Sequence, residues 1–197
     1  MAAPPEKGEL GEMKSKKRLL FAGVVAAIAV LAVPAMASAA VWKHNGSNLT
    51  KFVELGLTGG EVFETSSGNG MQCNLHATLV TEGGSTGEIT EYETESCGNG
   101  VGAFANCQLN TQEAIGLPWE VEVNTTDLTI VEWHVKRTFN GTGCTAGEVN
   151  KTIAEVTVEL TTPSAISEME FEGETTGYEM FGSFEVEGGN NGTYGIG

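Results

Sequence analysis

The stretch from Met71 to Cys107 constrains the fold most, because it combines a hairpin pattern with three of the four cysteines. Two runs of β-forming residues flank a Gly-rich segment, Gly83–Gly87, which predicts a β-hairpin. Folding at that turn brings Cys73 opposite the stretch that ends at Cys97. The pattern therefore predicts a hairpin closed by a disulfide across its open end.

All four cysteines lie after residue 39, and an even number of cysteines in an exported chain favours disulfides. No two of them have the C-x-x-C spacing typical of zinc sites, so we predict no metal site there. Four cysteines allow three pairings. The hairpin favours Cys73–Cys97 together with Cys107–Cys144, and the alternative is Cys97–Cys107 together with Cys73–Cys144.

Residues 1–39 have the three parts of a secretory signal peptide. A basic segment, Lys14–Arg18, precedes the apolar run Leu19–Val33, and Ala37–Ala39 presents small residues at a cleavage position. The apolar run is shorter than the roughly 20 residues needed to span a bilayer, so we expect cleavage after Ala39 rather than retention as an anchor. The mature part, residues 40–197, is then secreted.

Met13 is the expected start of translation, because the residues before it are unusual for a signal peptide. They include Glu6, Glu9 and Glu12, whereas this region of a signal is normally basic. Gly11–Met13 also reads as the translation of a purine-rich ribosome-binding sequence in front of a start codon. These features indicate a bacterial source.

The mature part is strongly acidic. The leader holds three Glu and five Lys/Arg residues, which leaves 23 acidic and five basic residues and a formal charge of −18. Such a surface repels nucleic acid and anionic lipid, so neither is expected as a partner. Asp127 is its only aspartate, and the closely spaced Asp and Asn residues of calcium loops are missing. We therefore read the acidity mainly as a solubilising outer surface.

Apolar and polar residues alternate in several segments of the mature part, which is typical of half-buried strands. Clear examples are Trp119–Val123, Ala154–Leu160 and Tyr178–Glu187. Gly-rich turn signals separate these segments, and no segment shows the period of an amphipathic helix. We predict an all-β, single-domain antiparallel sandwich or barrel of about ten strands after an N-terminal signal helix, with residues 40–197 forming one disulfide-stapled β domain.

Two finer expectations concern individual strands. Gly59-Gly60 is expected to break the chain between a strand at Lys51–Leu57 and another at Glu61–Thr65. In the segment Leu128–Phe139, strict alternation places Thr129, Val131, Trp133, Val135 and Arg137 on one face.

No credible catalytic group is evident, and we predict neither catalytic residues nor a cofactor. Ser85 lies in a G-x-S-x-G sequence, but a β-like run follows it where the nucleophile motif needs a helix. His44, His76 and His134 are scattered and are read as surface residues rather than metal ligands. Glutamates are so abundant that carboxylate pairs suited to glycoside cleavage would arise on any sheet face by chance.

Trp119 and Trp133 are the candidate ligand-binding residues, because they lie on neighbouring strands of a predicted hairpin. If they face the core, they pack there, which is the favoured interpretation. If they are exposed together, they form a platform for a carbohydrate or a partner protein.

The Met71–Cys107 pattern and the Leu117-Pro118-Trp119 segment resemble small exported β-proteins of actinobacteria. Those proteins carry a signal peptide, a Gly/Thr-rich β-domain and a few paired cysteines. The resemblance implies a location outside the cytoplasm and implies no particular chemistry.

Together these features predict a secreted, non-enzymatic protein of the cell envelope or extracellular space, with a structural or binding role. After signal cleavage no membrane attachment is expected, and the partner class is a glycan or an envelope protein. The alternative is a carbohydrate- or ligand-binding module that uses exposed Trp and Glu residues.

Overall fold

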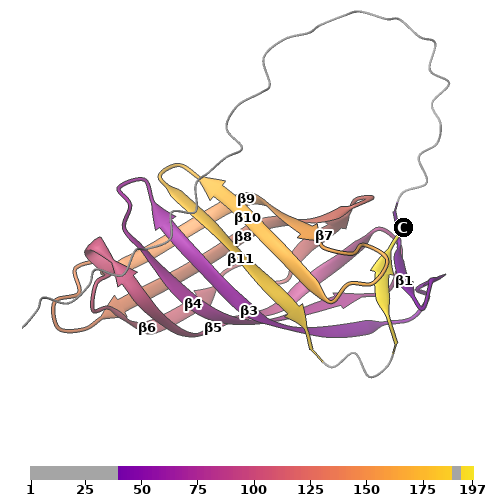
Figure 1. The fold of residues 1–197 in the computed structure, drawn as a ribbon, viewed down its shortest axis with the longest axis horizontal. Helices are drawn as coiled ribbons and strands as arrows, with labels where there is room; N and C mark the ends of the chain where they lie inside the picture. Colours follow the sequence, from indigo (N-terminus) through magenta and orange to yellow (C-terminus); the bar gives the residue numbers. More distant parts are fainter. Residues whose placement is uncertain (1–39, 188–191) are drawn as a thin grey trace, which may run out of the picture. The chain divides into compact units, whose positions relative to one another are not determined.

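Twelve β-strands make up the part of the chain that the computed structural model describes, residues 40–187 and 192–197 (Figure 1). Within these residues the one helical element is a 3-10 turn, η1 Gly102–Phe104. The strands are β1 Trp42–His44, β2 Ser47–Asn48, β3 Val53–Thr65, β4 Gly70–Thr81, β5 Thr86–Val101, β6 Gln108–Ala114, β7 Trp119–Val123, β8 Asp127–Asn140, β9 Glu148–Leu160, β10 Glu168–Thr175, β11 Tyr178–Val186 and β12 Tyr194–Ile196. The all-β prediction is confirmed, and the predicted signal helix lies outside the described residues.

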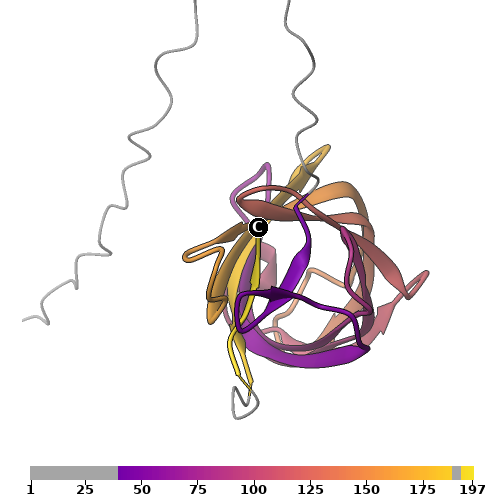
Figure 2. The same ribbon diagram turned by 90° about the vertical axis from the view of Figure 1, so that its right-hand side faces the viewer.

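Eight of these strands close into an antiparallel barrel. They follow the order β8-β7-β5-β4-β3-β11-β10-β9, and β9 pairs again with β8, so this ring of strands returns to its start (Figure 2). Closure leaves no free edge between β8 and β9 where another chain could add a strand. Of the two architectures that the sequence allowed, the structure has the barrel.

Strands β6 and β7 lie end to end along the same edge of β8. The residues of β6 pair with Val135–Asn140, and those of β7 pair with Leu128–Ile130. β7 also pairs with β5, whereas among the described residues no backbone ladder joins β6 to β5. The barrel wall therefore has a seam between β5 and β6.

A separate three-stranded sheet, in the order β12-β1-β2, brings the C-terminal strand beside the first strand. Trp42 of β1 is buried, and its indole Nε1 donates a hydrogen bond of 2.9 Å to the carbonyl oxygen of Thr86 on β5. Leu49 and Ile196 are buried in the same core. This sheet is therefore attached to the barrel by apolar packing as well as by hydrogen bonds.

The core consists of the inward-facing residues of the alternating pattern. On β3 these include Leu55, Leu57 and Phe63, and the residues between them face outward or are only partly buried. The strand continues through Gly59 and Gly60, so the predicted break is wrong. A Cβ atom at Gly59 would lie 1.8 Å from the carbonyl oxygen of Ser183 on β11, so this glycine permits a close approach of two strands rather than a turn.

Strand β8 changes face in its middle. Leu128 and Ile130 are buried, and after Glu132 the buried positions are Trp133, Val135 and further odd-numbered residues. Glu132 has a φ of 57° and is skipped in the pairing of β8 with β9. The buried positions are even-numbered before Glu132 and odd-numbered after it, so the expectation that Thr129 and Val131 share a face with Trp133 is wrong.

Two disulfides staple the barrel wall. Cys73 and Cys97 are directly opposed on β4 and β5, with an S–S distance of 2.10 Å. Cys107, just before β6, joins Cys144 in the loop between β8 and β9, with an S–S distance of 2.02 Å. This is the pairing that the sequence favoured, and disulfides are typical of proteins that fold in oxidising compartments.

Candidate functional site

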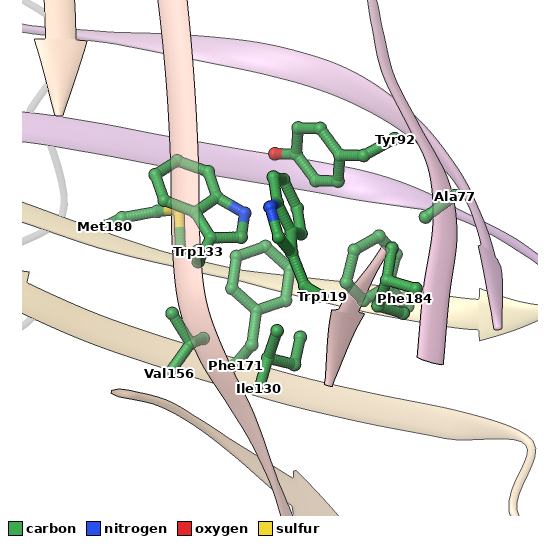
Figure 3. A pocket seen from close by; sticks show the side chains of 10 residues that line it. Ala77, Tyr92, Trp119, Ile130, Trp133, Val156, Phe171, Met180 and Phe184 are labelled. Atoms are coloured by element: carbon green, nitrogen blue, oxygen red, sulfur yellow. The ribbon is translucent and has the colours of Figure 1, made fainter. Parts of the chain in front are cut away.

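The tryptophans named as candidate ligand-binding residues do not form an exposed platform. Trp119 and Trp133 are each 2% exposed, and their ring centroids lie 5.9 Å apart in the barrel interior (Figure 3). Tyr92 packs against both rings. The strand alternation that places apolar residues inside places these indoles inside as well, which agrees with the favoured interpretation that they pack in the core and not with the alternative of an exposed platform.

Side chains fill the space around these rings. Ten residues, among them Trp119, Trp133 and Phe171, surround a void of about 10 Å³ (Figure 3). A void of that size holds at most about one water molecule. The barrel interior at this level is packed core, and a ligand would have to displace protein side chains to enter it.

A buried ion pair crosses the interior next to this core. Glu61 on β3 and Arg137 on β8 are each 1% exposed, and Glu61 Oε1 pairs with Arg137 Nη1. The hydroxyl of Tyr92 donates to Glu61 Oε2 at 2.6 Å and accepts from Arg137 Nη2 at 3.2 Å. Arg137 Nε donates to Thr94 Oγ1 at 3.1 Å, so several donors and acceptors of the buried pair are satisfied.

Aromatic rings complete the surroundings of the guanidinium. Its carbon lies 5.5 Å from the ring centroid of Phe63 and 6.0 Å from that of Trp133. Such cation–π contacts favour a desolvated cation. Burial, the largest single effect, lowers the pKa of Arg137, but the charge and hydrogen bond of Glu61 together with Tyr92 and Tyr178 outweigh it, and the pKa is raised overall. Arg137 therefore stays charged in the fold.

The neighbouring tyrosines keep their protons. Burial raises the pKa of Tyr92 well above its ordinary value, and the negative charge of Glu61 raises it further. The pKa of Tyr178 is raised by burial and by Glu61 in the same way. Arg137 opposes both shifts without cancelling them. Buried groups held in one protonation state suit a structural network better than acid–base catalysis.

This cluster was not predicted from the sequence, because the glutamates of alternating strands were assigned to the outer face. A signal was present in the spacing: Glu61 is separated by even intervals from Leu55, Leu57 and Phe63, all of which face the core. A charged residue on an inward-facing register position requires a buried partner. Arg137, the only arginine in residues 40–197, is that partner.

The remaining candidates are separate from one another. His44 stacks on Tyr194 with a centroid distance of 4.9 Å, and His134 Nε2 lies 2.8 Å from Asn150 Oδ1. His76 Nε2 lies 3.8 Å from a carboxylate oxygen of Glu187. In residues 40–187 and 192–197, no group of three or more His, Cys, Asp or Glu side chains could hold a metal ion. Ser85 lies in the turn between β4 and β5, with a strand after it.

Among the described residues, two of the hollows on the barrel surface are larger than the interior void and lie at opposite ends of β4. One has a volume of about 450 Å³ and lies beside the turn between β3 and β4, η1 and the start of β9. The other has a volume of about 790 Å³ and lies beside the turn between β4 and β5. We call this second hollow the Phe52 groove and define it by Phe52, Val80, Glu82, Glu88, Pro118 and Glu120. Both lie within the size range of ligand pockets.

A family model for proteins described as "Alkane oxidation protein activator PraA/PraB-like" matches residues 13–175. The chain belongs to the PraA/PraB-like family. Comparison with curated proteins and with solved structures gave no match.

The matched range of this PraA/PraB-like chain contains many of the features described above, but β11, β12 and Tyr178 lie beyond it. It runs to the last residue of β10 and includes both disulfides, the pair Glu61–Arg137 and the Phe52 groove. The family description is that of an activator rather than of a catalyst. Over the part of the chain that the structure describes, no helix is long and apolar enough to span a bilayer.

Proposed function

We propose that this chain is an exported, non-enzymatic accessory protein that promotes alkane oxidation by binding a partner outside the cytoplasm. The family description supplies the link to alkane oxidation. The predicted signal peptide and the two disulfides support an extracytoplasmic location. The resemblance to exported Gly/Thr-rich β-proteins of actinobacteria agrees with this location and remains a prediction.

The packed barrel interior is the observation that carries the binding role. With a void of about 10 Å³ at its aromatic centre, the barrel leaves no room there for an alkane chain or another substrate. The polar groups inside, Glu61, Tyr92 and Arg137, bond to one another and are buried from solvent. Binding is therefore expected at the outer surface, and both larger hollows lie there.

Extracellular complementation tests the proposal. A strain in which this gene is deleted should grow more slowly than the parent with hexadecane as the sole carbon source and equally well with acetate. Adding the purified, oxidised mature protein, residues 40–197, to the medium should restore growth on hexadecane. The same protein after reduction and alkylation serves as the unfolded control and should not restore it, because losing native disulfides typically costs about 2–5 kcal/mol each.

The location is tested by the same strain. A gene that encodes residues 40–197 without the leader keeps the protein in the cytoplasm and should not restore growth. Restoration by this cytoplasmic form, together with failure of the added protein, would contradict the proposal.

A further inference from the structure

The Phe52 groove combines an exposed aromatic ring with carboxylates. Phe52 is 61% exposed, the highest value among the large hydrophobic residues in the described part of the chain. It lies one residue before β3, and the alternation that turns Leu55 inward turns Phe52 outward. Pro118 is also exposed, and Val80 is partly buried. The groove therefore offers apolar surface that the barrel itself does not cover.

The carboxylates of the groove stand side by side on the outer face. Val80 on β4 is opposite Glu88 on β5, and Glu88 is opposite Glu120 on β7. Glu82 follows β4 in the same hollow. Like charges directly opposed in an antiparallel pair destabilise the sheet. Glu88 and Glu120 therefore repel each other across β5 and β7, and a cation bound between them would reduce this repulsion.

No base of the described chain neutralises these carboxylates. Ion pairs among the described residues join His76 with Glu187, Lys136 with Glu148, and Arg137 with Glu61. None of these pairs includes a carboxylate of the Phe52 groove. Lys51 precedes Phe52 in the sequence and forms no ion pair with the groove. The carboxylates of the groove have the same sign as the net charge of residues 40–197, so long-range attraction of a positively charged partner adds to the local attraction.

We propose that the Phe52 groove binds a basic, extended peptide segment of a partner protein, with an apolar side chain against Phe52 and Pro118 and lysine or arginine side chains against Glu82, Glu88 and Glu120. A second copy of this chain carries the same negative charge and is repelled, and the same holds for anionic lipid and nucleic acid. The volume of about 790 Å³ accommodates a short segment. This binding does not depend on the proposed role in alkane oxidation.

The test uses the full mature protein and the synthetic peptide acetyl-Lys-Phe-Lys-Phe-Lys-amide, with binding measured by isothermal titration calorimetry at about 0.15 M salt. The double variant Glu88→Gln/Glu120→Gln should weaken binding roughly tenfold, since it removes two opposed charges. Phe52→Ser should weaken it roughly fivefold while leaving the charge unchanged.

The matched control is Glu159→Gln/Glu170→Gln. These two glutamates are also exposed and directly opposed, on β9 and β10, but do not line the Phe52 groove. The control removes the same charge and should change the dissociation constant less than twofold. Equal weakening by both double variants, or no effect of Phe52→Ser, would mean that the peptide binds the acidic surface in general and would overturn the proposal. Absence of measurable binding to the unmodified protein would overturn it as well.

Discussion

At the scale of residues, the molecule's most unusual feature is a complete charge pair inside a β-barrel core. Removing two charges from water costs several kcal/mol per ion, and the cost is offset only where geometry and hydrogen bonds are good. Arg137 meets Glu61, Thr94 and Tyr92 and lies beside two aromatic rings, which supplies those conditions. The ion pair joins β3 to β8 across the barrel interior, although these two strands do not pair in the sheet.

Because the pKa values of Tyr92 and Tyr178 are raised in the fold, we predict a loss of stability at alkaline pH. Unfolded Tyr92 and Tyr178 ionise near pH 10, whereas burial and Glu61 raise the pKa of both in the fold. Because the folded pKa values are the higher ones, this stabilisation is complete below about pH 10 and is lost as the pH rises further. Above that pH, the free energy of unfolding should fall by roughly 1.4 kcal/mol per pH unit for each tyrosine.

Urea unfolding of oxidised residues 40–197 between pH 8 and pH 11.5 measures this slope. Tyr178→Phe removes one of the two titrating phenols and should reduce the alkaline slope by about half, even if it lowers stability at pH 8. If the free energy of unfolding of the unmodified protein stayed constant up to pH 11.5, the pKa values of Tyr92 and Tyr178 would not be raised in the fold.

At the scale of elements, the seam between β5 and β6 depends on one side chain. Gln112 Oε1 accepts the backbone N–H of Thr94 at 2.7 Å, and its Nε2 donates to the backbone carbonyl of Tyr92 at 3.2 Å. A neighbouring strand would normally supply both bonds, so the amide of Gln112 takes the place of a backbone peptide group. The two residues it holds are also members of the buried network.

Replacing Gln112 by alanine should therefore destabilise the barrel by about 1–3 kcal/mol, because it leaves a backbone donor and a backbone acceptor without these partners. The amide proton of Thr94 should also exchange faster with solvent, which hydrogen–deuterium exchange reports directly. Gln108→Ala on the same strand is the control. Gln108 is exposed, and its replacement should change stability by less than about 0.5 kcal/mol. Equal effects of the two variants would show that the hydrogen bonds of the Gln112 amide do not contribute to stability.

The sequence predicted most strands, and its errors have physical reasons. The alternating segments Trp119–Val123, Ala154–Leu160 and Tyr178–Glu187 located β7, the second half of β9 and β11, respectively. Gly59 was misread because a glycine that permits close packing and a glycine that permits a turn look the same in sequence. The change of face at Glu132 was missed because a glutamate with positive φ carries no local signal.

At the scale of the whole molecule, the sequence could predict an all-β fold but could not decide between a sandwich and a barrel. Alternation shows which residues share a face of a strand, not which strands are neighbours. Closure depends on the pairing of β8 with β9 and of β3 with β11, and the second of these pairs is far apart in the chain. The groove was missed for the same reason, because Phe52, Glu88 and Glu120 meet only when β3, β4, β5 and β7 are placed side by side.

The closed barrel also fixes how the acidic residues are distributed. Carboxylates are directly opposed across several strand pairs: Glu88 with Glu120, Asp127 with Glu159, Glu159 with Glu170, Glu168 with Glu185, Glu174 with Glu179, and Glu64 with Glu179. Each like-charge pair of this kind costs roughly 0.2–1 kcal/mol. The formal charge of −18 on residues 40–197 adds long-range repulsion to these local terms.

Salt should therefore stabilise this protein. Raising NaCl from about 0.01 M to 0.5 M shortens the Debye length from roughly 30 Å to below 8 Å and screens repulsion between exposed carboxylates. We expect the free energy of unfolding to rise by on the order of 1–3 kcal/mol, measured by urea unfolding at pH 7.5. The variant Glu159→Gln/Glu170→Gln should be more stable than the unmodified protein at low salt and should gain less from added NaCl. If NaCl left the unfolding midpoint unchanged or lowered it, the opposed carboxylates would not be a net cost to the fold, and the surface would have to contain compensating attractions.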